Sequence, residues 1–129
     1  MRVVFRVPQR TWYQKFRCAF RGFRLGVRGQ TSFLVHFLVA GAVVLAAALL
    51  QAERTEWCLL LVCITVVLAA EMFNSALEHL ARAVDRSENR HIASALDIGS
   101  AAVLTAAIGA SVVGSLVLVS RAAALFQLG

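Results

Sequence analysis

Three long apolar stretches decide what this chain can fold into, and they cover residues 33–50, 57–80 and 98–120. About 20 apolar residues cross the hydrocarbon core of a bilayer as a helix. Within lipid, only helices and closed barrels satisfy every backbone hydrogen bond. The chain is 60% hydrophobic, whereas soluble domains are about 45–50% apolar. We therefore predict an all-α membrane protein with three transmembrane helices, in which residues 1–129 form a single domain.

The segment before the first apolar stretch predicts a different kind of helix, over residues 10–28. At about 100° per residue, its apolar and basic side chains fall on separate faces. The apolar set is Trp12, Phe16, Ala19, Phe20, Phe23 and Val27, and the basic set is Arg10, Arg17, Arg21, Arg24 and Arg28. This pattern is typical of an amphipathic helix lying in the membrane interface. A targeting presequence has a similar pattern, but this helix leads directly into the first span.

The basic residues are unevenly distributed. Eight of the 13 Lys and Arg residues precede residue 30, and the formal net charge is +6. The positive-inside rule then places the N-terminus and the connection near residues 82–96 in the cytoplasm. With three spans, anionic lipid headgroups are the expected partner, and no nucleic acid is expected. The first apolar stretch is too long for a signal-peptide core, so we expect no cleaved leader.

The second apolar stretch carries polar residues where hydrocarbon is expected. Glu71, Asn74, Ser75 and Glu78 fall on one helix face, and the two carboxylates are about 10 Å apart along the axis. A charge near the bilayer centre costs about 2.5–3.5 kcal/mol on insertion scales. The polar face must therefore contact other helices, water or a ligand.

The polar face has the chemistry of a phosphoryl-transfer site. Carboxylates beside Asn74 suit a magnesium ion whose shell is completed by nucleotide phosphates and water. A deeper carboxylate, Glu71, can accept a proton from a hydroxyl held at the interface. Asp97, at the start of the third span, adds a further carboxylate near Glu78. A hydrogen-bond cluster that holds an oligomer together is the structural alternative.

The spacing of these residues resembles a known family. "EMFNSALE", followed by "LDIGSAAVL" with Asp97 nineteen residues after Glu78, is similar to the small prokaryotic diacylglycerol kinases, which include undecaprenol kinases. "FRCAFRGFRLGVR" also resembles the surface helix of that family, and the likeness covers about residues 10–120. The resemblance implies a homotrimer in the bacterial inner membrane. It also implies ATP as co-substrate, Mg²⁺, and active sites between protomers that phosphorylate a lipid hydroxyl.

The resemblance also implies roles for single residues. Glu71 resembles the catalytic base, Glu78 a Mg²⁺ ligand, and Asp97 the aspartate that contacts nucleotide. Further positions assigned from the family pattern are Gln30 as a second metal position, Glu88 and Asn89 at the nucleotide, and Asn74, Ser75, Ser100 and Arg10 as residues that shape the site or contact substrate. His36, His79 and His91 receive no role.

Three positions depart from the family pattern. Gln30 stands where the family has a second metal-binding glutamate, so the metal loses a charged ligand. Leu96 replaces the lysine before Asp97, and Arg82 replaces an aspartate. Arg82 or Arg90 could supply the missing cation to phosphate.

The sequence therefore predicts a lipid kinase acting on diacylglycerol or undecaprenol. Two alternatives remain open. One is a catalytically inactive relative with a structural or lipid-binding role, which Gln30 and Leu96 favour. The other is a small cation or proton conduit, because intramembrane carboxylates also build such pathways.

Overall fold

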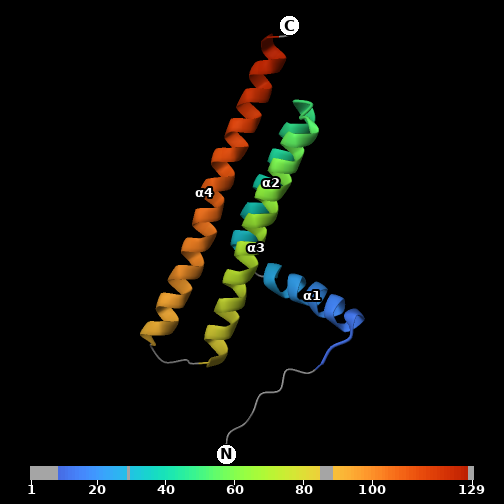
Figure 1. The fold of residues 1–129 in the computed structure, drawn as a ribbon. Helices are drawn as coiled ribbons and strands as arrows, with labels where there is room; N and C mark the ends of the chain where they lie inside the picture. Colours follow the sequence, from blue (N-terminus) through green and yellow to red (C-terminus); the bar gives the residue numbers. More distant parts are fainter. Residues whose placement is uncertain (1–8, 29, 85–88, 128–129) are drawn as a thin grey trace, which may run out of the picture.

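The computed structural model describes residues 9–28, 30–84 and 89–127, and within these ranges the chain is helical, without strands. The all-α prediction is confirmed. Figure 1 shows the four helices, which are α1 (Trp12–Val27), α2 (Thr31–Leu49), α3 (Arg54–Val84) and α4 (Arg90–Gln127).

Three helices, α2, α3 and α4, are long and apolar enough to cross a membrane, so the chain is a membrane protein. Two of them extend beyond the apolar stretches predicted at 57–80 and 98–120. The 31 residues of α3 and the 38 residues of α4 correspond to about 46 Å and 57 Å at 1.5 Å per residue. Both lengths exceed a hydrocarbon core of about 30 Å. The ends of α3 and α4 therefore project past the hydrocarbon.

Helix α1 begins with a capping box at Thr11. The Thr11 backbone N–H donates to Gln14 Oε1 at 3.0 Å, and the Gln14 backbone N–H donates to Thr11 Oγ1 at 3.4 Å, which satisfies two of the free donors at the helix start. From this cap, α1 runs toward the other helices, and its C-terminal end lies beside α3 (Figure 1), where a Cβ at Gly26 would lie 3.9 Å from the Met72 side chain. Trp12 and Phe16 on its apolar face are more than 70% exposed. The apolar face of α1 is therefore free to enter lipid, as its predicted surface position requires.

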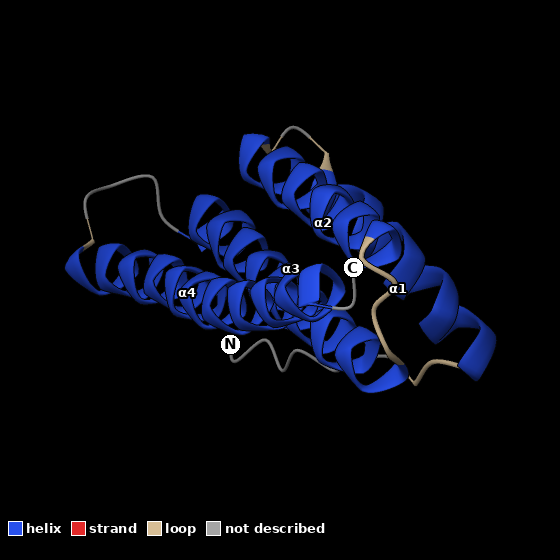
Figure 2. Cartoon of the chain, turned by 90° about the horizontal axis from the view of Figure 1, so that it is seen from above, coloured by secondary structure: helices blue, strands red, loops and turns tan. Residues whose placement is uncertain are grey.

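Helix α3 lies between α2 and α4 (Figure 2) and contacts each of the other helices. Among the residues that the structure describes, the buried hydrophobic side chains are few: Phe33 and Ala47 of α2, and Leu60 and Val67 of α3. Most other large apolar side chains are exposed. In a membrane protein, these exposed side chains face lipid or a partner chain.

Small residues of α4 let it approach α3 closely. The sequence singles out Ala102, Ala106, Ala110 and Gly114, which recur every four residues. Of these, Gly114 is buried, and a Cβ there would lie 4.0 Å from Leu60 Cδ2. Ala102 is exposed, so only part of the small-residue row faces α3.

Arg121 of α4 ties the turn between α2 and α3 to the third span. Its guanidinium donates to the Leu50 carbonyl at 3.1 Å and to the Gln51 carbonyl at 2.6 Å, and it pairs with Glu53 Oε1 at 3.0 Å. Gln51 has a φ of 53°, a backbone conformation that side chains other than Gly, Asn and Asp rarely adopt. The arginine thus donates hydrogen bonds to two carbonyls of a turn whose backbone conformation at Gln51 is energetically costly.

We expect Arg121→Met to lower the free energy of unfolding by about 2 kcal/mol, because two carbonyls lose a charged donor. Methionine keeps most of the apolar stem of the side chain. The measurement is denaturant or thermal unfolding of the protein in detergent micelles. Arg54→Met, at an exposed arginine that begins α3, is the matched control. Equal losses in the two variants would contradict the proposed contribution.

Candidate active site

Three polar side chains on one face of α3 are buried in the protein. Glu71 is 3% exposed, Asn74 is 8% exposed and Ser75 is 1% exposed. They continue the face that begins with Leu60 and Val67, so the same side of α3 changes from apolar to polar along its length. The polar face therefore packs inward, as predicted, and does not meet lipid.

Glu78 stands at the partly exposed end of this face and is surrounded by hydrogen-bond donors. Asn74 Nδ2 donates to Glu78 Oε1 at 3.2 Å, and Gln30 Nε2 donates to Glu78 Oε2 at 3.2 Å. Arg82, one turn later on α3, places a guanidinium nitrogen 3.5 Å from the same Oε2. Two of the three departures from the family pattern, Gln30 and Arg82, thus meet on a single carboxylate oxygen.

A glycine of α4 fixes the position of Asn74. A Cβ at Gly99 would lie 2.6 Å from Asn74 Oδ1 and 3.0 Å from Leu77 Cδ1. The absence of a side chain at Gly99 is what admits the amide of Asn74. The Oδ1 atom of Asn74 and the Oγ atom of Ser75 are buried without a hydrogen-bond partner. Both oxygens remain free to accept a hydrogen bond or to face a cation.

Glu71 has a neighbour that sequence reasoning missed. His36 of α2, whose side chain is 20% exposed, places Nε2 3.9 Å from Glu71 Oε2. The only signal in the sequence was a histidine inside an otherwise uncharged span. Spacing along the chain does not reveal which face of α2 meets α3, so the pairing becomes visible only in the folded chain.

Asp97 is exposed on α4 and no neighbour engages it within the described residues. It lies two residues from Gly99, which is about 200° around the helix from the face that meets Asn74. A single chain therefore does not bring Asp97 into the cluster around Glu78.

The other predicted positions are dispersed. Arg10 and Ser100 are exposed, and Ser100 Oγ donates to its own helix at the Leu96 carbonyl, 3.0 Å away. Asn89 Oδ1 accepts from the backbone N–H groups of His91 at 2.9 Å and Ile92 at 3.4 Å, so it caps α4. Glu88 lies outside the described residues.

A metal ion in this cluster would take part of its coordination shell from phosphate and water. Within residues 9–28, 30–84 and 89–127, no group of three His, Cys, Asp or Glu side chains could bind a metal ion by itself. Mg²⁺ in nucleotide sites needs one or two carboxylates, and phosphates and water complete the shell. Glu78 is one such carboxylate. The amide nitrogens of Gln30 and Asn74 now face Glu78, and a 180° rotation of each amide would present its oxygen to a cation instead. The Oδ1 atom of Asn74 has no hydrogen bond to lose in this rotation.

Comparison with known sequences identifies the family. Residues 17–118 match the family described as prokaryotic diacylglycerol kinase. The chain belongs to this family. It is 34% identical over 104 residues to a diacylglycerol kinase of Synechocystis sp., an alignment that covers 80% of this chain and 59% of the relative. The chain therefore spans less than two thirds of that relative's length, and the matched region contains every polar residue of the buried face.

We expect Gly99→Val to destabilise the fold by about 1–3 kcal/mol, because the new side chain overlaps Asn74 and Leu77. The control is Gly109→Val, since a Cβ at Gly109 of the same helix meets nothing within 4 Å. The control should change stability by less than about 0.5 kcal/mol. Unfolding in detergent measures both, and a cost at Gly99 no larger than at Gly109 would show that the close approach is absent.

Proposed function

We propose that this protein is a lipid kinase that transfers the γ-phosphate of ATP to the hydroxyl of diacylglycerol or undecaprenol. The observation that carries the proposal is the burial of Glu71 on the same face of α3 as Glu78. An ionisable group inside a membrane span is costly and is usually retained for function. Membership in the diacylglycerol kinase family supports the same reaction class.

The residues divide the work of the reaction. Glu71 Oε2 accepts the proton of the lipid hydroxyl as the oxygen attacks the γ-phosphorus. The bond between that oxygen and phosphorus forms, the bond from phosphorus to the β–γ bridging oxygen breaks, and ADP leaves with its electron pair. Glu78 and Gln30 would hold a magnesium ion, and the ion would neutralise phosphate charge. Asn74 and Ser75 orient the groups between the two carboxylates.

Arg82 offers a cation in place of the family lysine that is replaced by Leu96. Its side chain is 70% exposed and lies 3.5 Å from Glu78, so it can turn from the carboxylate to an arriving triphosphate at little cost. Arginine binds phosphate through paired N–H groups. Arg90, exposed at the first residue of α4, is the second candidate for this role.

The surroundings suit a reaction at the cytoplasmic membrane surface. The apolar face of α1 would lie in the inner leaflet, and its arginines would meet anionic headgroups. The exposed apolar surface of α2 and α4 is consistent with a homotrimer. In such an assembly, Asp97 would face a neighbouring protomer and contribute to the nucleotide site there.

The test of the proposed function is Glu71→Gln, compared with wild type, in mixed micelles containing labelled ATP and either lipid. We expect wild type to phosphorylate at least one lipid. The variant should lose at least about 100-fold in kcat, because a general base contributes 10²–10⁴-fold. Glutamine has nearly the same shape, so the oligomer measured by light scattering should persist.

Other outcomes point to the alternatives. If wild type phosphorylates neither lipid at any Mg²⁺ concentration, the kinase proposal fails and an inactive relative remains. If Glu71→Gln instead dissociates the oligomer, Glu71 acts in assembly. Cation or proton flux into liposomes that disappears in Glu71→Gln would identify a conduit.

Gln30→Glu should strengthen divalent-metal binding, because it restores a second carboxylate beside Glu78. We expect the Mn²⁺ dissociation constant, measured by electron paramagnetic resonance with a non-hydrolysable ATP analogue, to fall about tenfold, which corresponds to about 1.4 kcal/mol. Gln127→Glu, which adds the same charge at the exposed end of α4, is the control. An unchanged constant in Gln30→Glu would remove position 30 from the metal site.

A further inference from the structure

The carboxylate of Glu71 requires a group that accepts its proton, and neither the sequence nor the family pattern assigns one. A base buried to this degree must lose its proton after every turnover before it can act again. Direct contact with water is nearly absent at 3% exposure. Among the described residues, His36 is the one basic side chain within 4.0 Å of the carboxylate. A route for the proton therefore begins at His36.

We propose that His36 is the positioning residue for Glu71 and takes up the proton that Glu71 removes from the lipid hydroxyl. The inference rests on the proposed function. Once Glu71 carries the proton, the Nε2 atom of His36, in the tautomer with its proton on Nδ1, can accept it from Glu71 Oε2. The 3.9 Å separation exceeds a hydrogen bond, but contacts of catalytic groups are often long without substrate and shorten when it binds.

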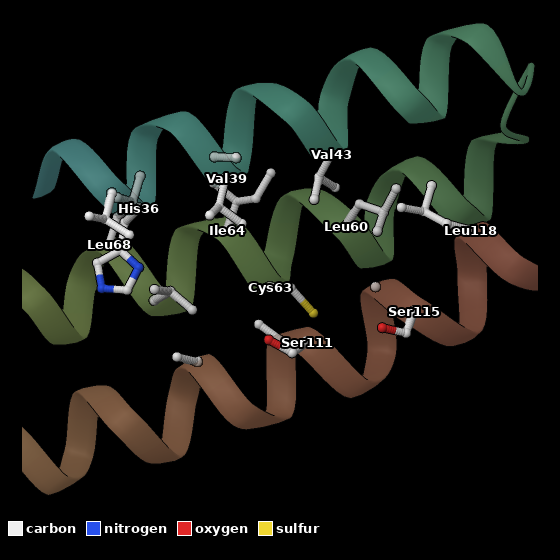
Figure 3. A pocket seen from close by; sticks show the side chains of 16 residues that line it. His36, Val39, Val43, Leu60, Cys63, Ile64, Leu68, Ser111, Ser115 and Leu118 are labelled. Atoms are coloured by element: carbon white, nitrogen blue, oxygen red, sulfur yellow. The ribbon is translucent and has the colours of Figure 1, made fainter. Parts of the chain in front are cut away.

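His36 also borders a space that connects this pair to the membrane interior. Figure 3 shows its imidazole at one end of a cavity of about 420 Å³ between α2, α3 and α4. The walls are mainly aliphatic, with Leu60 and Val67 among them. The imidazole is thus the polar group at the end of an apolar space, next to the proposed base.

The surroundings leave few other groups to exchange protons with His36. On α3, the titratable side chains that face it or share its cavity are Glu71 and Cys63. The α4 residues that line the cavity carry no titratable side chain. The proton therefore passes from Glu71 Oε2 to His36 Nε2, and the imidazolium releases its Nδ1 proton through its exposed edge. Glu71 returns to the carboxylate, and His36 is left with its proton on Nε2. Proton exchange with water at the exposed edge of the ring restores the Nδ1 tautomer before the next turnover.

The first experiment is chemical rescue. His36→Ala leaves a space of imidazole size at the end of the cavity. We expect kcat for lipid phosphorylation to fall at least tenfold, the lipid KM to stay within twofold, and added imidazole to restore most of the rate. His36→Leu, which fills the space, should be equally slow and should not respond to imidazole. His79→Ala, at an exposed histidine of α3, controls for effects of imidazole elsewhere.

The second experiment does not depend on activity. The ring nitrogens of ¹⁵N-labelled histidine are observed by NMR at one fixed pH in wild type and in Glu71→Gln. Loss of the carboxylate beside Nε2 should shift the ring-nitrogen signals of His36, while those of His79 and His91 stay unchanged.

The outcomes separate the two proposals. His36 ring-nitrogen signals that are unchanged in Glu71→Gln overturn the pairing, even in a protein that phosphorylates neither lipid. A wild-type rate in His36→Ala, or a loss that imidazole does not restore, overturns the proton transfer. Activity that is absent from wild type refutes the proposed function alone, and the NMR comparison then decides whether His36 and Glu71 are paired.

Discussion

The rest of the structure depends on one constraint, which is that a carboxylate on a membrane-spanning helix must be kept away from hydrocarbon. Glu71 satisfies it by facing inward, at 3% exposure. Because α3 has polar groups over two turns of this face, α2 and α4 must both cover it. The central place of α3 between them (Figure 2) follows from that need. Burial without any partner would cost several kcal/mol, and His36 and Gln30 from the α2 side place polar groups beside this face.

The sequence was informative where a pattern of apolar and polar residues allows only one kind of helix. Apolar stretches of about 20 residues predicted three spans, and separated apolar and basic faces predicted the surface helix. The i, i+3, i+4 and i+7 spacing from Glu71 predicted a shared polar face, and the structure buries that face as expected. Helix ends were less predictable, since α4 begins at Arg90, before the predicted apolar stretch, and continues past it to Gln127. The single domain and the cytoplasmic N-terminus stay predictions.

Contacts between helices could not be read from spacing alone. Nothing in the order of residues shows that His36 faces Glu71, or that Gln30 and Arg82 meet on the same oxygen of Glu78. These contacts depend on the rotation of each helix about its axis, which is set by packing. The sequence also grouped Asp97 with Glu78, because the predicted span lengths place both residues near the same membrane surface. The turn of α4 that seats Gly99 against Asn74 directs Asp97 elsewhere.

The arginine at position 121 gives the three spans a common fixed point at the end of the molecule far from Glu71. Arg121 and Gly99 are separated by 22 residues of one helix, or about 33 Å at 1.5 Å per residue. When α4 pivots about this point, displacement grows with distance from it. A tilt of only 5° or so shifts Gly99 by about 3 Å. Small angular freedom at the tethered turn thus becomes a much larger displacement of α4 where Gly99 packs against Asn74.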